Sequence, residues 1–280
     1  MSKKIAVVTG ASSGIGLLST IELARAGFQV VGSMRDLGRR EYLEKAAADA
    51  GVSGSMDVRR IDVTEFGTIA ALVAGVVRDY GRIDVLLNNA GFAMAGFAED
   101  LTLEEIRTQF ETNFFGNVAM TQAVLPVMRQ QKSGHVIMMS SIAGLCAPLA
   151  ISSYAASKFA LEGWSESLRL ELNALGIKVV LVEPGSYETD IWSRNTRLGE
   201  KTLDGTSPNQ ERGARMKERV QSVKKRNPIE VARLVVRIAQ NPNPKLRYVV
   251  GTDAKIQLAL KRVLPWKQYE KVIAYFLKVD

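Results

Sequence analysis

The sequence is poor in the side chains that build disulfides and metal sites. Its 280 residues include one cysteine, Cys146, and one histidine, His135. A single cysteine excludes an intrachain disulfide and fits a reducing compartment, and a chain of this length that is 46% hydrophobic can bury a full core without one. We expect Cys146 to line a pocket wall. Because His135 has no cysteine or acidic cluster beside it, we interpret it as structural and expect no metal site.

The sequence also lacks a hydrophobic run suited to crossing a membrane or directing secretion. The longest uncharged stretch, residues 133–157, is rich in serine and glycine and contains Pro148, which disfavours a membrane-spanning helix. The opening Met1-Ser2-Lys3-Lys4 leads directly into an apolar run and does not resemble a signal peptide. We therefore expect a cytoplasmic protein. No repeat or linker divides the chain, so we expect residues 1–280 to form one domain.

What the sequence does contain is an alternation of short apolar runs with amphipathic helical segments. This pattern predicts a parallel sheet with helices on both faces, a doubly wound, Rossmann-like α/β fold. We expect about seven strands, at residues 5–9, 29–33, 55–61, 84–88, 135–140, 177–182 and 246–250.

A glycine-rich turn follows the first apolar run. Gly10, Gly14 and Gly16 separate residues 5–9 from a predicted helix at 17–26. Backbone N–H groups at a helix start attract phosphate, and glycines let a pyrophosphate approach closely. The spacing differs from the commoner Gly-x-Gly-x-x-Gly fingerprint. The turn therefore indicates a dinucleotide site, with an ordinary tight turn as the alternative.

Two later strands also end in small polar residues, where parallel sheets bind their ligands. One run ends in Asn88-Asn89-Ala90-Gly91, and another ends in Ser140-Ser141. Asn89 could face a ligand or link two strands. Neighbours on a strand point to opposite faces, so the two serines compete for one role. We favour Ser141 for the site and interpret Ser140 as a packing residue.

A tyrosine and a lysine stand four positions apart in a segment that reads as helical. Tyr154 and Lys158 would then lie on one face, one turn apart. A free tyrosine has a pKa of about 10, and a cation about 4 Å away would lower it by roughly 3 units. We therefore predict that Lys158 brings the pKa of the phenol toward neutrality, so that Tyr154 can exchange protons. A chance pairing, with the lysine merely solvated, is the alternative.

Together these segments strongly resemble the short-chain dehydrogenase/reductase family, and most of all its steroid and retinol dehydrogenase-like branch. The resemblance runs from Lys4 to about Thr189. It rests on Thr9-Gly10-x3-Gly14-Ile15-Gly16, Asn88-Asn89-Ala90-Gly91, Asn113, Ser141, Tyr154-x3-Lys158 and Pro184-Gly185-x3-Thr189. The resemblance implies a single sheet with strand order 3-2-1-4-5-6-7.

The same resemblance implies the catalytic roles. Tyr154 would be the general acid and base, and Lys158 would tune its pKa and bind the nicotinamide ribose. Ser141 would hydrogen-bond the substrate oxygen, and Asn113 would help to hold a proton-relay water. Thr189 would meet the carboxamide of the nicotinamide. The implied cofactor-binding set is Gly10, Ser12, Ser13, Gly14, Ile15, Gly16, Arg35, Asp62, Val63, Asn89, Ala90, Gly91, Tyr154, Lys158, Pro184, Gly185 and Thr189.

Charge at the end of the second predicted strand bears on the cofactor. An acidic residue there would bind the 2'-hydroxyl of NAD, but the family pattern places Met34 at that position and Arg35 directly after it. A guanidinium suits the 2'-phosphate of NADP by charge and by geometry. We therefore expect NADP rather than NAD, although Asp36 stands only one residue further along.

Two segments of the C-terminal third extend the expected core. By resemblance, residues 186–227 would form a lid over the substrate, and the long helix at 153–175 would pack against a second subunit in a homodimer or homotetramer. Residues 254–280 would form an amphipathic helical extension. Within it, apolar residues stand at helical spacing with lysines elsewhere on the helix: Trp266, Tyr269, Val272, Ile273 and Phe276, and Lys267, Lys271 and Lys278.

Basic residues concentrate in the same third. Residues 1–185 hold 17 basic and 19 acidic side chains, whereas residues 186–280 hold 20 and 10. The excess could be a solvated surface, with Arg194 and Arg197 doing nothing specific. It could attract cofactor phosphates or an acidic substrate, or it could contact a membrane, which we do not favour. No nucleic-acid reading motif accompanies the charge, so we expect no nucleic-acid partner.

The sequence therefore predicts an oxidoreductase that interconverts a carbonyl and an alcohol on a hydrophobic small molecule, steroid-, retinoid- or lipid-like. Reduction of a 3-oxoacyl thioester is the alternative within enzymology. An NADP-binding regulatory protein is the alternative outside it, although Asn113, Ser141, Tyr154 and Lys158 are all present.

Overall fold

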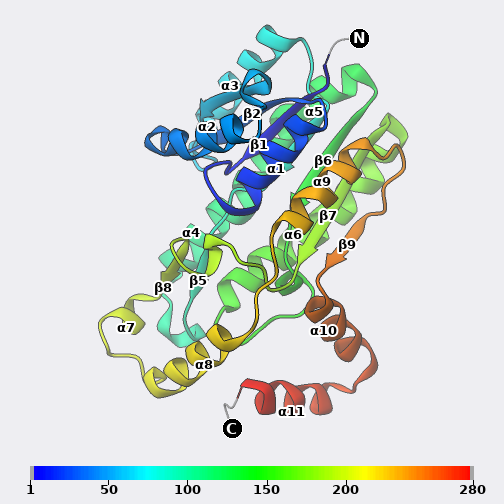
Figure 1. Ribbon diagram of the computed structural model, residues 1–280. Coiled ribbons are helices and arrows are strands. Elements are labelled where there is room, and N and C mark those ends of the chain that lie inside the picture. Colours follow the sequence, from blue (N-terminus) through cyan, green and yellow to red (C-terminus); the bar gives the residue numbers. More distant parts are fainter. Residues whose placement is uncertain (1–2, 278–280) are drawn as a thin grey trace.

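A seven-stranded parallel sheet forms the centre of the molecule in the computed structural model (Figure 1). Its order is β3-β2-β1-β4-β6-β7-β9, which confirms the predicted fold and strand order because β6, β7 and β9 are the fifth to seventh strands. The strands are β1 (Ile5–Thr9), β2 (Gln29–Met34), β3 (Met56–Arg60), β4 (Val85–Asn88), β6 (Gly134–Met139), β7 (Ile177–Pro184) and β9 (Arg247–Val250). The structure describes residues 3–277 apart from the side chains of 219–221, so Met1, Ser2, Lys278 and the rest of 278–280 lie outside the described residues.

Helices cover both faces of the sheet. Side chains of alternate residues along β1 point to opposite faces, so Ala6 and Val8 join one core and Ile5 and Val7 join the other. Burial on both faces explains why the strands read as continuous apolar runs. One core includes residues of α1 (Gly14–Arg25), α2 (Arg40–Asp49) and α9 (Ile229–Gln240), and the other includes residues of α3 (Phe66–Tyr80), α5 (Gly116–Gln131) and α6 (Ser152–Leu172).

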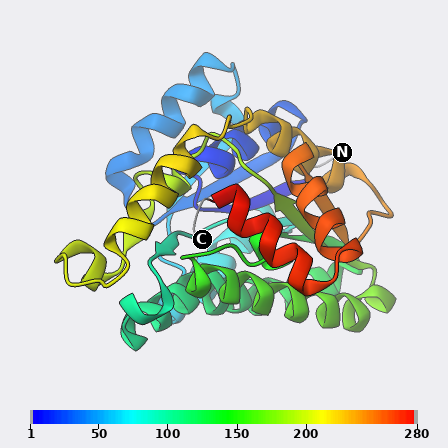
Figure 2. The same ribbon diagram turned by 90° about the horizontal axis from the view of Figure 1, so that it is seen from below.

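The remaining elements gather beyond the carboxyl ends of the strands (Figure 1). They are α4 (Leu103–Phe110), the short parallel pair β5 (Ala93–Ala95) and β8 (Thr196–Leu198), α7 (Glu200–Leu203), α8 (Gln210–Ser222), α10 (Thr252–Val263) and α11 (Trp266–Leu277). Figure 2 shows this end from below, with α11 lying between α8 and α10, and it packs against both. Single helical turns also occur at Leu37–Arg39, Ser53–Ser55, Ala98–Asp100, Ile142–Gly144, Asn173–Leu175 and Asp190–Trp192.

Helix boundaries differ from the predicted ones by a few residues. The helix predicted at 153–175 is α6, which ends at Leu172 and tightens into a 3₁₀ turn at Asn173–Leu175. Such tightening is common where the last carbonyls of a helix need partners. None of the helices among the described residues is long and apolar enough to cross a membrane.

Candidate active site

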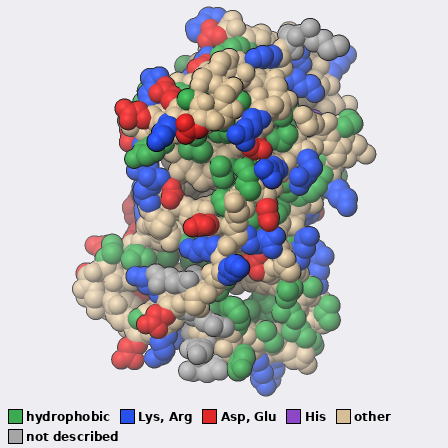
Figure 3. Space-filling model, viewed as in Figure 1, with side chains coloured by type: hydrophobic (Ala, Val, Ile, Leu, Met, Phe, Trp, Pro, Cys, Tyr) green, Lys and Arg blue, Asp and Glu red, His purple; other side chains and the backbone are tan. Residues whose placement is uncertain are grey.

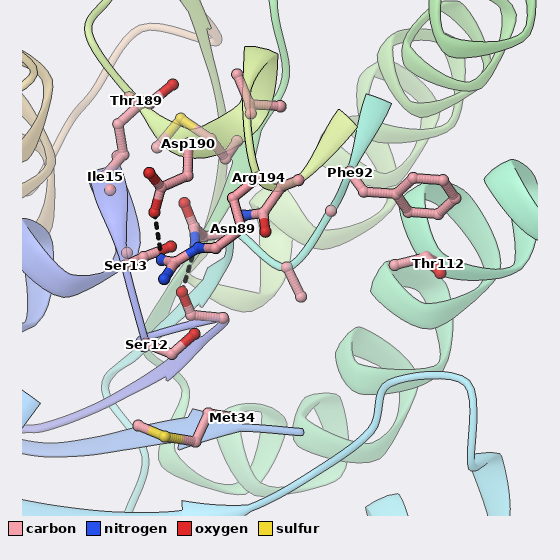
Figure 4. A pocket seen from close by; sticks show the side chains of 18 of the residues that line it. Ser12, Ser13, Ile15, Met34, Asn89, Phe92, Thr112, Thr189, Asp190 and Arg194 are labelled. Atoms are coloured by element: carbon pink, nitrogen blue, oxygen red, sulfur yellow. Dashed lines mark hydrogen bonds and ion pairs between the residues drawn. The ribbon is translucent and has the colours of Figure 1, made fainter. Parts of the chain in front are cut away.

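A cleft of about 430 Å³ opens at the carboxyl ends of the strands. Every residue predicted for catalysis or cofactor binding lines it except Asn113. Figure 4 shows Ser12, Ser13, Asn89, Asp190 and Arg194 converging on one part of this cleft, with Phe92 and Thr112 at the other side. Segments that are far apart in the sequence therefore meet in one place, because parallel strands present their ends at one edge of the sheet.

The glycine loop is shaped by close backbone approaches. Gly10 has φ +69°, a conformation that favours glycine. A Cβ atom at Gly16 would lie 2.2 Å from the carbonyl oxygen of Gly10, so no other residue fits between α1 and the loop. Helix α1 then begins without a side-chain cap from Ser13 and without an acidic residue in its first turn. Such a helix start suits the phosphates of a dinucleotide.

Asn89 links two strands, as one of its two interpretations predicted. Its Nδ2 donates to the carbonyl oxygen of Thr9 at 2.9 Å, and the backbone N–H groups of Asn89 and Ala90 both donate to Thr9 Oγ1 at 3.0 Å. These bonds join the ends of β1 and β4. Asn89 also lines the cleft, so it supports the loop that would face a cofactor.

Tyr154 and Lys158 lie on one buried face of α6, as their spacing predicted. Both side chains are almost fully buried, and both line the cleft. Lys158 Nζ lies 5.7 Å from the centre of the Tyr154 ring and donates to the carbonyl oxygen of Met139 at 2.8 Å. The lysine is therefore held by β6 and is not a solvated surface residue.

The predicted direction of the Tyr154 pKa is wrong for the protein alone. Burial raises the pKa of Tyr154 to about 12, and a hydrogen bond with Ser141 opposes that rise. Burial also lowers the pKa of Lys158 to about 8, against the attraction of Glu162. Removal of both groups from water disfavours their charged forms, and a helical spacing carries no information about this burial.

The two serines at the end of β6 face different neighbours. Ser141 lines the cleft, and its Oγ accepts a hydrogen bond from the Ala143 backbone N–H at 3.1 Å. Ser140 is buried, and a Cβ atom at Gly144 would touch Ser140, Lys158 and Glu162, which shows that these three surround one point. Ser140 lines the cleft as well, but the hydroxyl that hydrogen-bonds Tyr154 is that of Ser141.

Asn113 lies behind the cleft and does not line it. It sits in a π-helical turn at Glu111–Phe115, between α4 and α5. Its Oδ1 accepts from the Phe92 backbone N–H at 3.1 Å, and its Nδ2 donates to the Phe92 carbonyl oxygen at 3.0 Å. π-helical turns are frequent at functional sites. In this structure the Asn113 side chain holds the backbone of Phe92, which does line the cleft.

A partly buried cluster of charged side chains joins α6 to β7 and β9. Arg247 on β9 contacts Glu162 at 2.9 Å, Glu166 at 2.6 Å and Glu183 at 3.6 Å. Burial raises the pKa of Glu162, and burial together with Glu162 raises the pKa of Glu183 to about 8. Two carboxyl groups so close in a low-dielectric interior resist being charged together. Sequence analysis missed this group because its members come from three separate elements.

The end of β2 presents cations to the cleft. Arg35 lies 4.0 Å from Asp62, and a second arginine, Arg39, lines the cleft as well. The carboxylate of Asp36 accepts from the Gly38 backbone N–H at 2.9 Å and lies 3.8 Å from Arg39. Asp36 also lines the cleft, with one carboxylate oxygen held by its own turn. Sequence analysis missed Arg39. Its place in the cleft depends on the helical turn Leu37–Arg39, which the sequence did not predict.

Segment 186–227 supplies further cleft residues that sequence analysis did not assign. The ring of Trp192 meets that of Tyr154 edge to face, with centres 5.6 Å apart. Arg194 pairs with Asp190, and the guanidinium of Arg197 lies 4.6 Å from the centre of the Phe92 ring. Both arginines thus line the cleft, each with a defined partner.

The single cysteine and histidine lie outside the cleft lining. Cys146 is fully buried beside Ala254, so the expectation that it lines a pocket wall is wrong. His135 meets the carbonyl oxygen of Asn241 at 2.8 Å, and burial lowers its pKa, which fits a structural residue. Within residues 3–277, no group of three or more metal-ligating side chains is placed to hold an ion.

Comparison with known proteins points to one family. A family model described as short chain dehydrogenase matches residues 4–198. The chain is 41% identical to the uncharacterized oxidoreductase YusZ of Bacillus subtilis over 281 residues, covering 98% of both chains. It is 35% identical to retinol dehydrogenase 8 of Bos taurus over 269 residues, covering 92% of this chain and 85% of that protein.

Solved structures give the same result for the fold. A short-chain dehydrogenase from Streptomyces avermitilis superposes with a TM-score of 0.81 at 33% identity, covering 97% of this chain and 98% of that one. A metagenomic short-chain oxidoreductase in complex with NADP has a TM-score of 0.70 at 27% identity, with 89% and 96% covered. A Burkholderia phymatum relative in complex with NAD, at 24% identity, has a TM-score of 0.79 with 93% of each chain covered. Solved neighbours of this fold thus hold NAD or NADP.

Proposed function

The chain belongs to the short-chain dehydrogenase family and is an oxidoreductase that acts on CH–OH groups, and we propose that it uses NADP to interconvert a carbonyl and an alcohol on a hydrophobic molecule. One observation carries the proposal. Tyr154, Ser141 and Lys158 share a single cleft with the glycine loop and the uncapped start of α1. The residues present therefore fit a nicotinamide dinucleotide beside a proton donor.

When bound, a nicotinamide would supply the hydride that the carbonyl carbon receives in the reduction. The Tyr154 hydroxyl would give its proton to the carbonyl oxygen, which becomes the alcohol, and the resulting phenolate beside Lys158 would take a proton from solvent. The Ser141 hydroxyl donates to the same oxygen while negative charge develops on it. Because burial holds the pKa of Tyr154 at about 12 in the protein alone, the phenol is fully protonated at neutral pH and ready for this direction.

Apolar side chains support a hydrophobic substrate. Phe92, Ile191 and Trp192 line the cleft near Tyr154, and Trp192 contacts the Tyr154 ring directly. We propose that segment 186–227, which contributes two of these three residues, is a lid over the substrate. Pockets for small apolar molecules are commonly lined in this way, with a few polar groups that fix orientation.

The test of this function is a turnover screen with the purified full chain. NADPH oxidation would be followed with steroid, retinoid, aliphatic and acyl-thioester carbonyls, and we expect turnover of at least one of the first three classes. Tyr154→Phe removes the proton donor and serves as the negative control. We expect its kcat to fall about 10²-fold or more and its NADPH binding to stay nearly unchanged. Substantial residual turnover by Tyr154→Phe would contradict the assigned role.

Two arginines just after β2 support the proposed preference for NADP. Arg35 and Arg39 both reach the cleft, and Met34 stands where an acidic residue would bind the ribose of NAD. We expect Arg39→Ser to raise the KM for NADPH about 10-fold, since it removes one charged contact to a phosphate. The KM for NADH should stay within about twofold, because the 2'-hydroxyl offers the guanidinium no charge. An equal change for both cofactors would contradict NADP preference.

Reduction of a 3-oxoacyl thioester remains the second candidate, favoured by Arg194 and Arg197 in the cleft lining. An acidic acyl carrier would be drawn to such cations. Turnover of carrier-bound thioesters above that of free ketones would select this candidate. Absence of turnover with every class, despite tight NADPH binding, would instead select a regulatory protein.

Self-association through α6 is a further part of the proposal. Phe159 and Leu170 are exposed on this helix, although its other face is firmly packed on the sheet. Exposed apolar side chains on a rigid helix suit a two-fold interface between identical chains. Light scattering on Leu170→Glu tests it, with a smaller assembly expected than for the wild type.

A further inference from the structure

The two C-terminal helices, α10 and α11, have few buried side chains. Along α10 and α11 only Ala254 and Tyr269 are buried. Large apolar residues are exposed instead: Ile256 at 55%, Val263 at 79%, Trp266 at 62%, Val272 at 39% and Tyr275 at 84%. An amphipathic helix in a globular protein usually hides its apolar side against the core. Among the large side chains of α10 and α11, Tyr269 is buried and Leu258 packs, partly buried, against the core.

The exposed apolar residues form a visible patch. Figure 3 shows hydrophobic side chains gathered at the lower right of the molecule, over α10 and α11, with Lys and Arg side chains next to them. Patches of this kind mark interaction sites, because single scattered apolar residues are normal on a surface but contiguous ones are not. The elbow between α10 and α11, at Val263–Trp266, carries two of the large residues.

The charged residues of the same two helices are mostly basic. Lys255, Arg262, Lys267 and Lys271 are exposed. The two acidic side chains are already engaged, since Asp253 accepts from the Ser186 backbone N–H at 2.7 Å and Glu270 accepts from Trp266 Nε1 at 2.6 Å. Basic side chains therefore outnumber acidic ones on these helices, and the patch combines apolar anchors with an excess of positive charge.

We propose that α10 and α11 bind peripherally to the surface of an anionic lipid bilayer. Tryptophan and tyrosine suit the boundary between headgroups and acyl chains, where one end of the ring is apolar and the other is wet. Basic side chains beside an apolar face are the pattern of helices that lie in this boundary. A two-fold contact with a second copy would instead bring the same basic residues together. The inference goes beyond the proposed enzymatic function and does not rest on it.

Two contacts fix the position of this surface on the protein. Asp253 at the start of α10 holds the backbone of Ser186, next to the cleft residue Gly185. Lys261 near its end donates to the carbonyl oxygen of Leu145, in the loop after Ser141. Helix α10 is thus attached at both ends to loops of the cleft, and it presents its outer side to the bilayer.

The experiment is vesicle co-sedimentation of the full chain. Vesicles of phosphatidylglycerol and phosphatidylcholine in equal parts would be compared with phosphatidylcholine alone, at low and high salt. We expect binding to the anionic vesicles only, weakened at high salt as the Debye length falls from about 10 Å at 0.1 M to about 3 Å at 1 M. The double variant Trp266→Ser/Tyr275→Ser should bind about 10-fold or more weakly, because it loses two apolar anchors.

Tyr42→Ser in α2 is the matched control, since Tyr42 is 63% exposed on a helix far from α10 and α11 (Figure 1). It should bind like the wild type. Tryptophan emission of the wild type should shift to the blue on anionic vesicles, and Trp266→Phe should lose the shift. Absence of binding, equal binding by the double variant, or conversion of a wild-type dimer to a monomer by the double variant would each overturn the proposal.

Discussion

Helix α6 and the pair α10–α11 are of similar total length, but they stand in opposite relations to the core. Helix α6 buries ten of its side chains, whereas α10 and α11 together bury two. In α6, burial shifts the pKa values of Tyr154, Lys158 and Glu162. The buried side chains of α6 thus have shifted pKa values, which suits proton transfer. The exposed apolar side chains of α10 and α11 remain available for association.

The largest expected effect comes from the buried cation of α6. Lys158→Met should lower kcat/KM about 10²-fold or more, because Tyr154 loses the neighbouring cation that assists its proton transfer. The same change should raise stability at pH 7 by about 1–3 kcal/mol, since it removes a buried charge. The pKa of Lys158 is lowered to about 8 in the folded protein. The wild type should therefore gain stability as pH rises from about 8 to 10.5, and the variant should not.

Urea unfolding at pH 7 and pH 10, with activity measured on the same samples, checks this prediction. A variant that loses activity and stability together would show that Lys158 is a packing residue and that its burial costs nothing. Such an outcome would remove the main contrast between α6 and α10–α11.

An apolar residue of α6 gives the next largest effect. Leu161 is fully buried in the core beneath the cleft. Leu161→Ala should destabilise the protein by about 2–5 kcal/mol, because a cavity remains where the side chain was. Denaturant unfolding measures the loss. A change below about 1 kcal/mol would mean that α6 is loosely packed after all.

The buried carboxyl group behind α6 predicts a pH dependence. Glu183 has its pKa raised to about 8, so its protonated form is favoured on folding. Its stabilising contribution is complete below the unfolded pKa near 4.5 and is lost as pH rises through 8. Glu183→Gln mimics the protonated form, so its stability advantage over the wild type should grow by roughly 2 kcal/mol or more between pH 5 and pH 8.

Glu166→Gln is the control for that measurement. Glu166 also contacts Arg247, but its carboxylate is exposed, so the pH dependence should match that of the wild type. Parallel pH profiles for all three proteins would contradict the raised pKa of Glu183.

The smallest effect is expected on α10. Val263 is 79% exposed, so Val263→Ser should change stability by less than about 0.5 kcal/mol. Thermal unfolding beside Leu161→Ala gives the direct contrast between the two helices. A loss approaching that of Leu161→Ala would indicate that a second copy covers Val263 in solution.

Elements that depend on neighbouring residues could be predicted from the sequence. Central strands such as β1, β4 and β6 were predictable because buried parallel strands are apolar runs that end beside glycine, amide or hydroxyl residues. The position of Ser141 followed from the edge at which such strands end, whereas that of Tyr154, on α6, followed from its spacing to Lys158 and from the family resemblance. The parallel pairing of Ala93–Ala95 with Thr196–Leu198 could not be predicted in this way, since it joins segments a hundred residues apart.

Properties that depend on burial were beyond the sequence. The Tyr154 pKa moved opposite to the prediction because its environment excludes water, and a spacing of four residues carries no information about solvent. The Asn113 side chain contacts the Phe92 backbone from a π-helical turn, and the residue pattern did not predict this turn. The apolar stripe that begins at Trp266 was visible in the sequence, but only the structure reveals that Trp266 and Val272 remain exposed.

The attachments of α10 to Ser186 and Leu145 have a thermodynamic consequence. Both attachments reach loops that border the cleft, so they offer a route by which a ligand at one place can alter the free energy of binding at the other. Linkage is reciprocal: any factor by which a surface changes the affinity for a dinucleotide is the factor by which the dinucleotide changes adhesion to that surface. Cofactor titrations performed with and without vesicles would then report a single coupling constant.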